Sequence, residues 1–100
     1  MMTDAALAIG KAIRTARKEL GLEQWVLAEQ IGAKQVTVSA WEMGRTVPTL
    51  KMLKKLIDEL GLDEEEMMSQ YDKQRKYARA RKKERAAAPA SATAQKKSEN

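Results

Sequence analysis

Apolar residues recur every three or four positions in five segments of the chain, and this spacing predicts five amphipathic helices. The segments cover residues 9–22, 24–31, 34–43, 50–60 and 63–71. In the first, the apolar stripe runs through positions 9, 13, 16 and 20. Thr3 or Asp4 can cap the start of this helix, and a glycine follows each of the first four helices, as is common where a helix ends. No segment has the alternation of a strand, so the pattern predicts an all-α protein.

The chain changes in character after Tyr71. From there to about residue 87, charged residues and alanines dominate, so we expect the fifth helix to continue into solvent without a face to bury. Pro89 then opens a small, polar segment that predicts disorder. The expected organisation is a folded domain over residues 1–70, a basic, helix-prone extension over 71–87 and a disordered tail over 88–100.

Composition excludes most catalytic chemistry. The 100 residues contain neither Cys nor His, so a disulfide framework, a thiolate zinc site and the commonest general base are all missing. The acidic run from Asp63 to Glu66 predicts the start of a helix with a capping box, because four consecutive residues do not converge on one ion. We therefore expect no enzymatic activity, no metal and no cofactor.

The net charge of +5 is unevenly distributed. Residues 1–68 hold nine basic and eleven acidic residues, a net charge of −2, whereas residues 69–87 hold eight basic and two acidic residues, a net charge of +6. A net positive charge favours an anionic partner, and nucleic acid is the first candidate. The acid at Asp4 does not fit a secretory signal, and no apolar run approaches the length of a membrane span, so we expect a soluble protein in the cytoplasm, associated with the nucleoid, with no membrane partner.

The most informative stretch is residues 24–42, QWVLAEQIGAKQVTVSAWE, in which two short helices meet at a tight turn. Ala28 is small enough for the helices to cross closely, and Gly32 suits the turn. Val38 and Trp41 lie about one turn apart and are predicted to enter the core. Alanine, glycine four positions later and a branched apolar residue ten positions later form a far more specific pattern than any single residue type.

These motifs resemble the phage-repressor and Cro family of helix-turn-helix proteins, also called the xenobiotic-response-element family. The resemblance covers residues 9–68 and rests on R-x-x-x-G-L-x-Q from Arg17, L-A-x-x-x-G from Leu27, S-x-W-E-x-G from Ser39 and the block over 48–60. It implies a compact five-helix fold like that of lambda repressor, followed here by the basic extension and the tail. Residues 72–100 lie outside the resemblance.

The resemblance places residues 34–43 in the major groove of double-stranded DNA as a recognition helix. The implied base-reading residues are Lys34, Gln35, Val36, Ser39 and Ala40. Gln35 can bond an adenine edge and Val36 can pack on a thymine methyl, whereas Ala40 replaces a longer polar residue that is common in the family. The implied phosphate-binding residues are Gln24, Thr37 and Arg45.

Two conspicuous residues, Arg17 and Glu42, match a structural ion pair of the family. A catalytic acid is the alternative for Glu42, but a lone carboxylate without a second acid or a His has no reaction to perform. Trp25 departs from the family pattern. One interpretation is that Trp25 is a locally altered core contact or a tolerated surface residue. The other is that its side chain packs on DNA or on a partner protein. Met67, Met68 and Tyr71 form either ordinary core or part of a dimer seam.

The eight bases of the extension form what we call the basic arm: Lys73, Arg75, Lys76, Arg79, Arg81, Lys82, Lys83 and Arg85. The arm is either a solvated tail that aids solubility or an electrostatic contact to nucleic acid.

The predicted function is that of a sequence-specific DNA-binding transcriptional regulator, a repressor that binds an inverted-repeat operator as a homodimer. One alternative is an antitoxin-type interaction protein that regulates its own operon and binds a protein partner through the extension. The other is a sequence-indifferent nucleic-acid binder that uses the basic arm.

Overall fold

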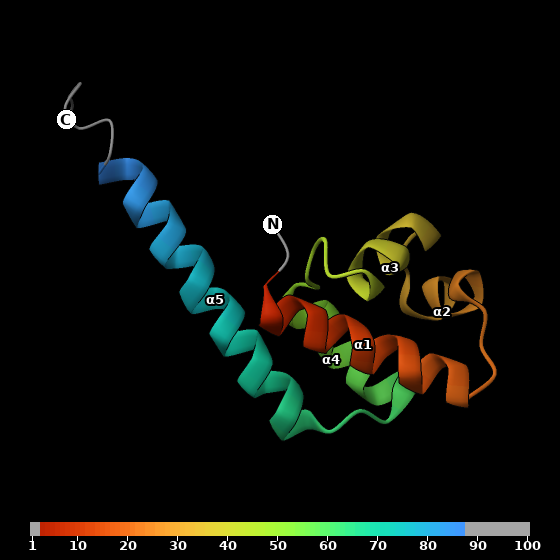
Figure 1. Ribbon diagram of the computed structural model, residues 1–100. Coiled ribbons are helices and arrows are strands. Elements are labelled where there is room, and N and C mark those ends of the chain that lie inside the picture. Colours follow the sequence, from red (N-terminus) through yellow and green to blue (C-terminus); the bar gives the residue numbers. More distant parts are fainter. Residues whose placement is uncertain (1–2, 88–100) are drawn as a thin grey trace.

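The computed structural model describes residues 3–87, and side chains through residue 80. Five helices and no strand occur in this part of the chain: α1 (Asp4–Glu19), α2 (Gln24–Ile31), α3 (Gln35–Glu42), α4 (Leu50–Leu60) and α5 (Glu64–Ala87). Helices α1 to α4 and the first half of α5 enclose one core, and the rest of α5 extends beyond it (Figure 1). The all-α, five-helix prediction is confirmed, whereas the predicted disordered tail over 88–100 lies outside the described residues.

The helices begin and end close to the predicted positions. Thr3 caps α1 by accepting a hydrogen bond from the Ala6 N–H at 3.0 Å, and Thr49 caps α4 in the same way. Asp63 accepts from the Glu66 N–H at 2.8 Å, which is one half of the predicted capping box. Local side-chain chemistry therefore determines these starts.

One position of the predicted apolar stripe, Leu20, is not part of the core. The helix ends at Glu19, and the Leu20 side chain is 55% exposed. Gly21 adopts a left-handed φ of +71°, and the Leu22 N–H then bonds the Arg17 carbonyl at 3.0 Å. This arrangement closes the helix as a Schellman motif and brings Leu22 against the core in place of Leu20. The prediction that Leu20 joins the core was wrong, because the helical spacing of apolar residues was extended beyond the residue at which the helix ends.

The core is built from the predicted apolar faces. Its buried side chains come from all five helices and are Ile9, Ile13, Leu27, Ala28, Ile31, Val38, Trp41, Leu53, Leu56, Leu60 and Met67. Gly10 allows α1 to approach the end of α3, because a Cβ at this position would lie 2.2 Å from the Trp41 carbonyl oxygen. The crossing of α1 and α3 therefore depends on a residue without a side chain.

Helix α5 packs along α1 further than the sequence indicates. Met68 and Tyr71 pack against the core, and Gln74 and Tyr77 are half-buried as well. The Thr3 hydroxyl donates a hydrogen bond to Gln74 Oε1, and α1 contributes the buried, small residues Ala5 and Ala6 near the same end. The expectation that nothing after Tyr71 buries a face was wrong, because the polar side chain of Gln74 finds a partner in Thr3, the residue that caps α1.

Candidate nucleic-acid interface

Helices α2 and α3 form a compact two-helix unit. Helix α2 ends at Gly32, whose φ is +75°, and the Ala33 N–H bonds the Ala28 carbonyl at 2.8 Å. Three residues therefore suffice for the turn into α3. Val38 and Trp41 of α3 are buried, so the inner face of this helix is occupied by the core. The opposite face remains for a ligand.

The exposed end of α3 is its N-terminal end. Lys34, which precedes the helix, and Gln35 are exposed, and Val36 is 73% exposed. Thr37, Ser39 and Ala40 are half-buried. The base-reading residues inferred from the resemblance thus divide into an outward group at positions 34–36 and a more enclosed group further along the helix.

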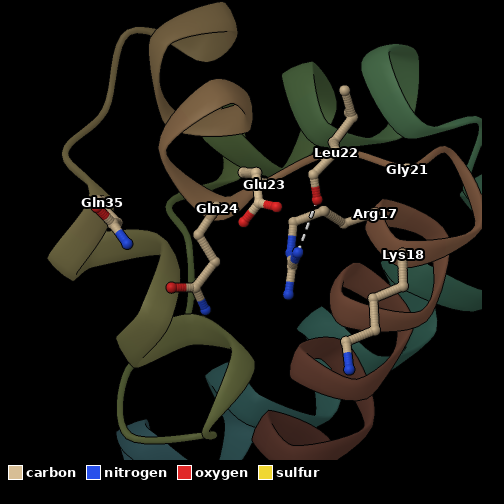
Figure 2. A pocket seen from close by; sticks show the side chains of 7 residues that line it. All are labelled: Arg17, Lys18, Gly21, Leu22, Glu23, Gln24 and Gln35. Carbon is tan, nitrogen blue, oxygen red and sulfur yellow. Dashed lines mark hydrogen bonds between the residues drawn. The ribbon is translucent and has the colours of Figure 1, made fainter.

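A pocket of about 440 Å³ lies between the end of α1, the start of α2 and the start of α3 (Figure 2). Lys18, Gln24 and Gln35 contribute side chains to its lining. Lys18 comes from the last turn of α1, and the sequence motifs give no role to this residue. The signal that could have identified it is its place in the sequence, since the last turn of α1 leads directly to the start of α2.

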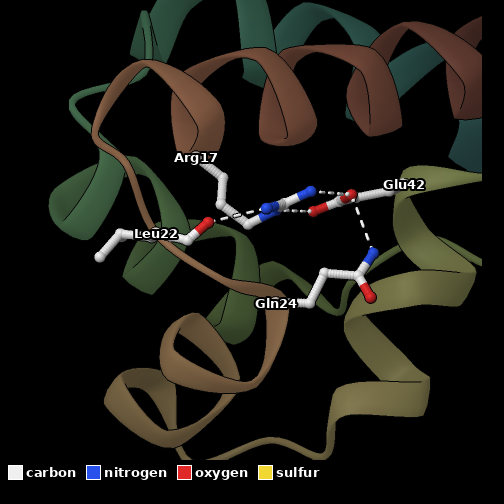
Figure 3. A network of polar contacts seen from close by, with 4 residues as sticks. All are labelled: Arg17, Leu22, Gln24 and Glu42. Atoms are coloured by element: carbon white, nitrogen blue, oxygen red, sulfur yellow. Dashed lines mark hydrogen bonds and ion pairs between the residues drawn. The ribbon is translucent and has the colours of Figure 1, made fainter.

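Arg17 and Glu42 form a buried ion pair that joins α1 to the end of α3 (Figure 3). Arg17 Nε lies 2.6 Å from Glu42 Oε2, Nη2 donates to Oε1 at 3.0 Å, and Nη1 donates to the Leu22 carbonyl at 2.7 Å. The hydrogen bond to Glu42 raises the pKa of the Arg17 guanidinium, although burial acts in the opposite direction. The guanidinium of Arg17 thus donates hydrogen bonds to the Glu42 carboxylate and to the Leu22 carbonyl at the same time.

Gln24 belongs to the same network. Its Nε2 donates to Glu42 Oε1 at 3.1 Å, which links the first residue of α2 to the last residue of α3. A carboxamide nitrogen carries two protons, so one remains for another acceptor. The sequence pattern does not predict this bond, because a separation of eighteen positions leaves no periodic signal.

The remaining inferred site residues lie around this unit. Arg45 is exposed in the turn after α3, where its N–H bonds the Ala40 carbonyl at 3.0 Å. Trp25 is 56% exposed and does not join the core, so its side chain is available at the start of α2. Of the basic arm, the side chains of Lys73, Arg75, Lys76 and Arg79 are described and exposed. Those of Arg81, Lys82, Lys83 and Arg85 lie outside the described side chains.

Within the described residues, no group of three His, Cys, Asp or Glu side chains is placed to hold a metal ion. None of the helices in this part of the chain is both long and apolar enough to cross a membrane.

Two short helices joined by a tight turn, with the second buried on one face and exposed at its N-terminal end, define a helix-turn-helix protein. A family model described as helix-turn-helix matches residues 13–67, which is more than half of the chain. The chain belongs to this family, and its resemblance to the phage-repressor and Cro type is confirmed.

Curated relatives agree with this assignment. An uncharacterised helix-turn-helix-type transcriptional regulator of Methanothermobacter thermautotrophicus is 45% identical over 49 residues, which cover 49% of this chain and 71% of the relative. Multiprotein-bridging factor 1 of Debaryomyces hansenii is 43% identical over 54 residues, covering 54% of this chain and 36% of the relative. The same factor of Candida albicans is 38% identical over 56 residues, covering 56% of this chain and 37% of the relative. The chain therefore matches little more than a third of the length of the two fungal proteins.

Proposed function

We propose that the protein is a transcriptional regulator that binds double-stranded DNA sequence-specifically through α3. The observation that carries the proposal is the exposed N-terminal end of α3, with Lys34, Gln35 and Val36 pointing away from a core that holds the rest of the helix. Membership in the helix-turn-helix family and the archaeal relative's name support it. We propose that this function is one of binding without enzymatic activity, in the cytoplasm and associated with the nucleoid.

The exposed side chains match the chemistry of base edges in the major groove. Gln35 forms a pair of hydrogen bonds to an adenine, Val36 contacts a thymine methyl, and Lys34 donates to a guanine. Ser39 and Ala40 are half-buried and contribute only short-range contacts further along the helix.

Phosphate contacts fix the position of α3 in the groove. Gln24 donates its second Nε2 proton to a phosphate at the N-terminus of α2, and Arg45 and Thr37 contact the backbone on either side of α3. These contacts orient the domain and carry no sequence preference of their own.

A homodimer on an inverted repeat is the assembly that we propose. Helix-turn-helix dimers place their recognition helices about 34 Å apart, one turn of DNA, so the operator would have two half-sites with that spacing. Occupancy of such a site at a promoter excludes polymerase, and we therefore propose repression.

Selection on a random duplex library tests the proposal. The full chain is compared with Gln35→Ala and with Gln30→Ala, an exposed glutamine of α2 on which the proposal places no contact. We expect a palindromic consensus bound about a thousandfold above random DNA, lost or altered at one position per half-site in Gln35→Ala and unchanged in Gln30→Ala. No enrichment by the unmodified chain would overturn the proposal.

A second candidate is a protein that joins other proteins at DNA. The name multiprotein-bridging factor of the two fungal relatives favours it, although the match covers only 37% and 36% of their length. Protection of residues 72–100 from proteolysis by a co-purified partner would support this candidate. Protection of the same residues by DNA alone would argue against it.

A further inference from the structure

The second half of α5 is one continuous helix with its first half. Helix α5 runs from Glu64 to Ala87 without a break. At 1.5 Å per residue, the part beyond Gln74 extends about 20 Å from the point where α5 contacts the start of α1. Figure 1 shows α5 passing the N-terminal end of α1 and continuing beyond it. The basic arm is therefore built on a helix and not on irregular chain.

This helix is held to the body of the protein at the place where the basic arm begins. Met67 is buried, Tyr71 packs against the core, and Tyr77 is half-buried one and a half turns further along. Between them, Gln74 accepts the hydrogen bond of the Thr3 hydroxyl, and Thr3 itself caps α1. These contacts fix the direction of α5 relative to α1.

The attachment point lies beside the end of α3. A Cβ at Gly10 would meet the Trp41 carbonyl oxygen, and one at Gly44 would meet the Leu7 side chain at 2.7 Å, so the first turns of α1 lie directly on the end of α3. The start of α1 thus lies next to Gly44, which precedes the exposed Arg45, and its N-cap Thr3 bonds Gln74 of α5.

The charge of the protein is concentrated on the same part of α5. Lys73, Arg75, Lys76 and Arg79 are exposed, and the sequence places four more bases between positions 81 and 85. By contrast, residues 1–68 carry nine basic and eleven acidic residues, a net charge of −2. The helix-turn-helix domain by itself has no excess positive charge to attract DNA.

We propose that the second half of α5 is a rigid cationic arm that lies along DNA phosphates outside the half-site read by α3. This inference rests on the proposed function. It adds a second region of contact with DNA, which does not depend on the DNA sequence. The exposed positions between Asp72 and Ala80 are charged or alanine, so this surface lacks the large apolar side chains that anchor a protein partner. Neutralisation of phosphates releases counterions and needs no apolar surface.

The dependence of affinity on salt tests whether the basic arm contacts DNA. The double variant Lys76→Gln, Arg79→Gln is compared with Lys11→Gln, Lys55→Gln, which removes two exposed bases from α1 and α4. Each phosphate contact contributes about 0.9 to the slope of log affinity against log salt, so we expect the slope to fall by about 1.8 in the first variant and to stay constant in the second. Equal slopes in the unmodified chain and in the arm variant would overturn the inference.

A second variant tests rigidity without changing charge. Ala80→Pro interrupts α5 and keeps all eight bases, whereas Ala92→Pro makes the same substitution in the tail. Hydroxyl-radical footprinting of the selected site should show protected flanking phosphates with the unmodified chain and with Ala92→Pro, and loss of that protection with Ala80→Pro. Protection that survives Ala80→Pro would show a flexible tail and contradict a rigid arm.

The outcomes separate this inference from the proposed function. Salt slopes measured on a random duplex report on the basic arm even where no operator is selected. A selected operator with no contribution from Lys76 and Arg79 would leave the proposed function standing and overturn the arm.

Discussion

Arg17 and Glu42 join the last turn of α1 to the end of α3 through two parallel hydrogen bonds, with side chains only 10% and 3% exposed. The pair therefore stands between the core and the candidate DNA interface. Glu42 uses one carboxylate oxygen for both Arg17 and Gln24, so the same group stabilises the fold and orients a residue that we propose contacts phosphate.

Removal of one member of this pair should be costly. Arg17→Met leaves the Glu42 carboxylate without its cationic partner and the Leu22 carbonyl without the donor from Arg17, and a stranded buried charge costs about 3–5 kcal/mol in the free energy of unfolding. Chemical denaturation measures this, with Arg14→Met, an exposed position of the same helix, as the control that should change little. The double variant Arg17→Met, Glu42→Leu should recover part of the loss. An unchanged free energy of unfolding in Arg17→Met would contradict a stabilising pair.

Gly10→Ala should lower the stability of the protein, whereas helix propensity alone predicts that it raises it. In the middle of a helix, alanine is favoured over glycine by about 1 kcal/mol. At position 10, however, the new Cβ would lie 2.2 Å from the Trp41 carbonyl oxygen, a backbone atom that cannot rotate away. We expect Gly10→Ala to destabilise the protein by about 1–3 kcal/mol, because α1 and α3 must separate. Thr15→Ala, at an exposed position of α1, is the matched substitution and should be close to neutral. A gain in stability for Gly10→Ala would show that the two helices are not in contact.

A single sequence predicts the positions of the helices in this protein, but it does not predict the contacts between residues that are far apart in the chain. Helix positions followed from local signals, namely apolar spacing, capping side chains such as Thr3 and Asp63, and the terminal glycines. Contacts between distant positions left no such signal. Neither the closeness of Gly10 to Trp41 nor the bond from Thr3 to Gln74 can be inferred from spacing, because each depends on how complete helices cross.

In the candidate site, too, the exposed face of a helix could be predicted and the contacts between helices could not. The exposed positions 34–36 of α3 could be inferred from the pattern, since the inward positions 38 and 41 determine which face is left. The bond from Gln24 to Glu42 and the place of Lys18 beside Gln24 could not, because the first depends on how α2 and α3 cross and the second on where the end of α1 meets the start of α2.

Gln24 should affect both stability and DNA binding. Gln24→Glu places a second carboxylate beside Glu42 and removes the 3.1 Å hydrogen bond, so we expect a loss of about 1–3 kcal/mol in the free energy of unfolding. The same change puts a negative charge against a phosphate, and affinity should fall for all DNA sequences alike. Gln30→Glu makes the same change of charge at an exposed position of α2 and is the control for both measurements. Equal affinities of the two variants would remove Gln24 from the proposed phosphate contacts.

Trp25 allows the interface to be observed directly. The chain has two tryptophans, of which Trp41 is buried at 5% exposure and Trp25 is 56% exposed directly after Gln24. Because Gln24 is proposed to contact phosphate, DNA bound there lies against the neighbouring indole, and we expect this contact to quench the emission of the unmodified chain. Trp25→Phe leaves only Trp41, whose emission should stay constant on titration. A constant emission in both proteins would assign Trp25 to the tolerated apolar residues of the surface, which single exposed side chains commonly are.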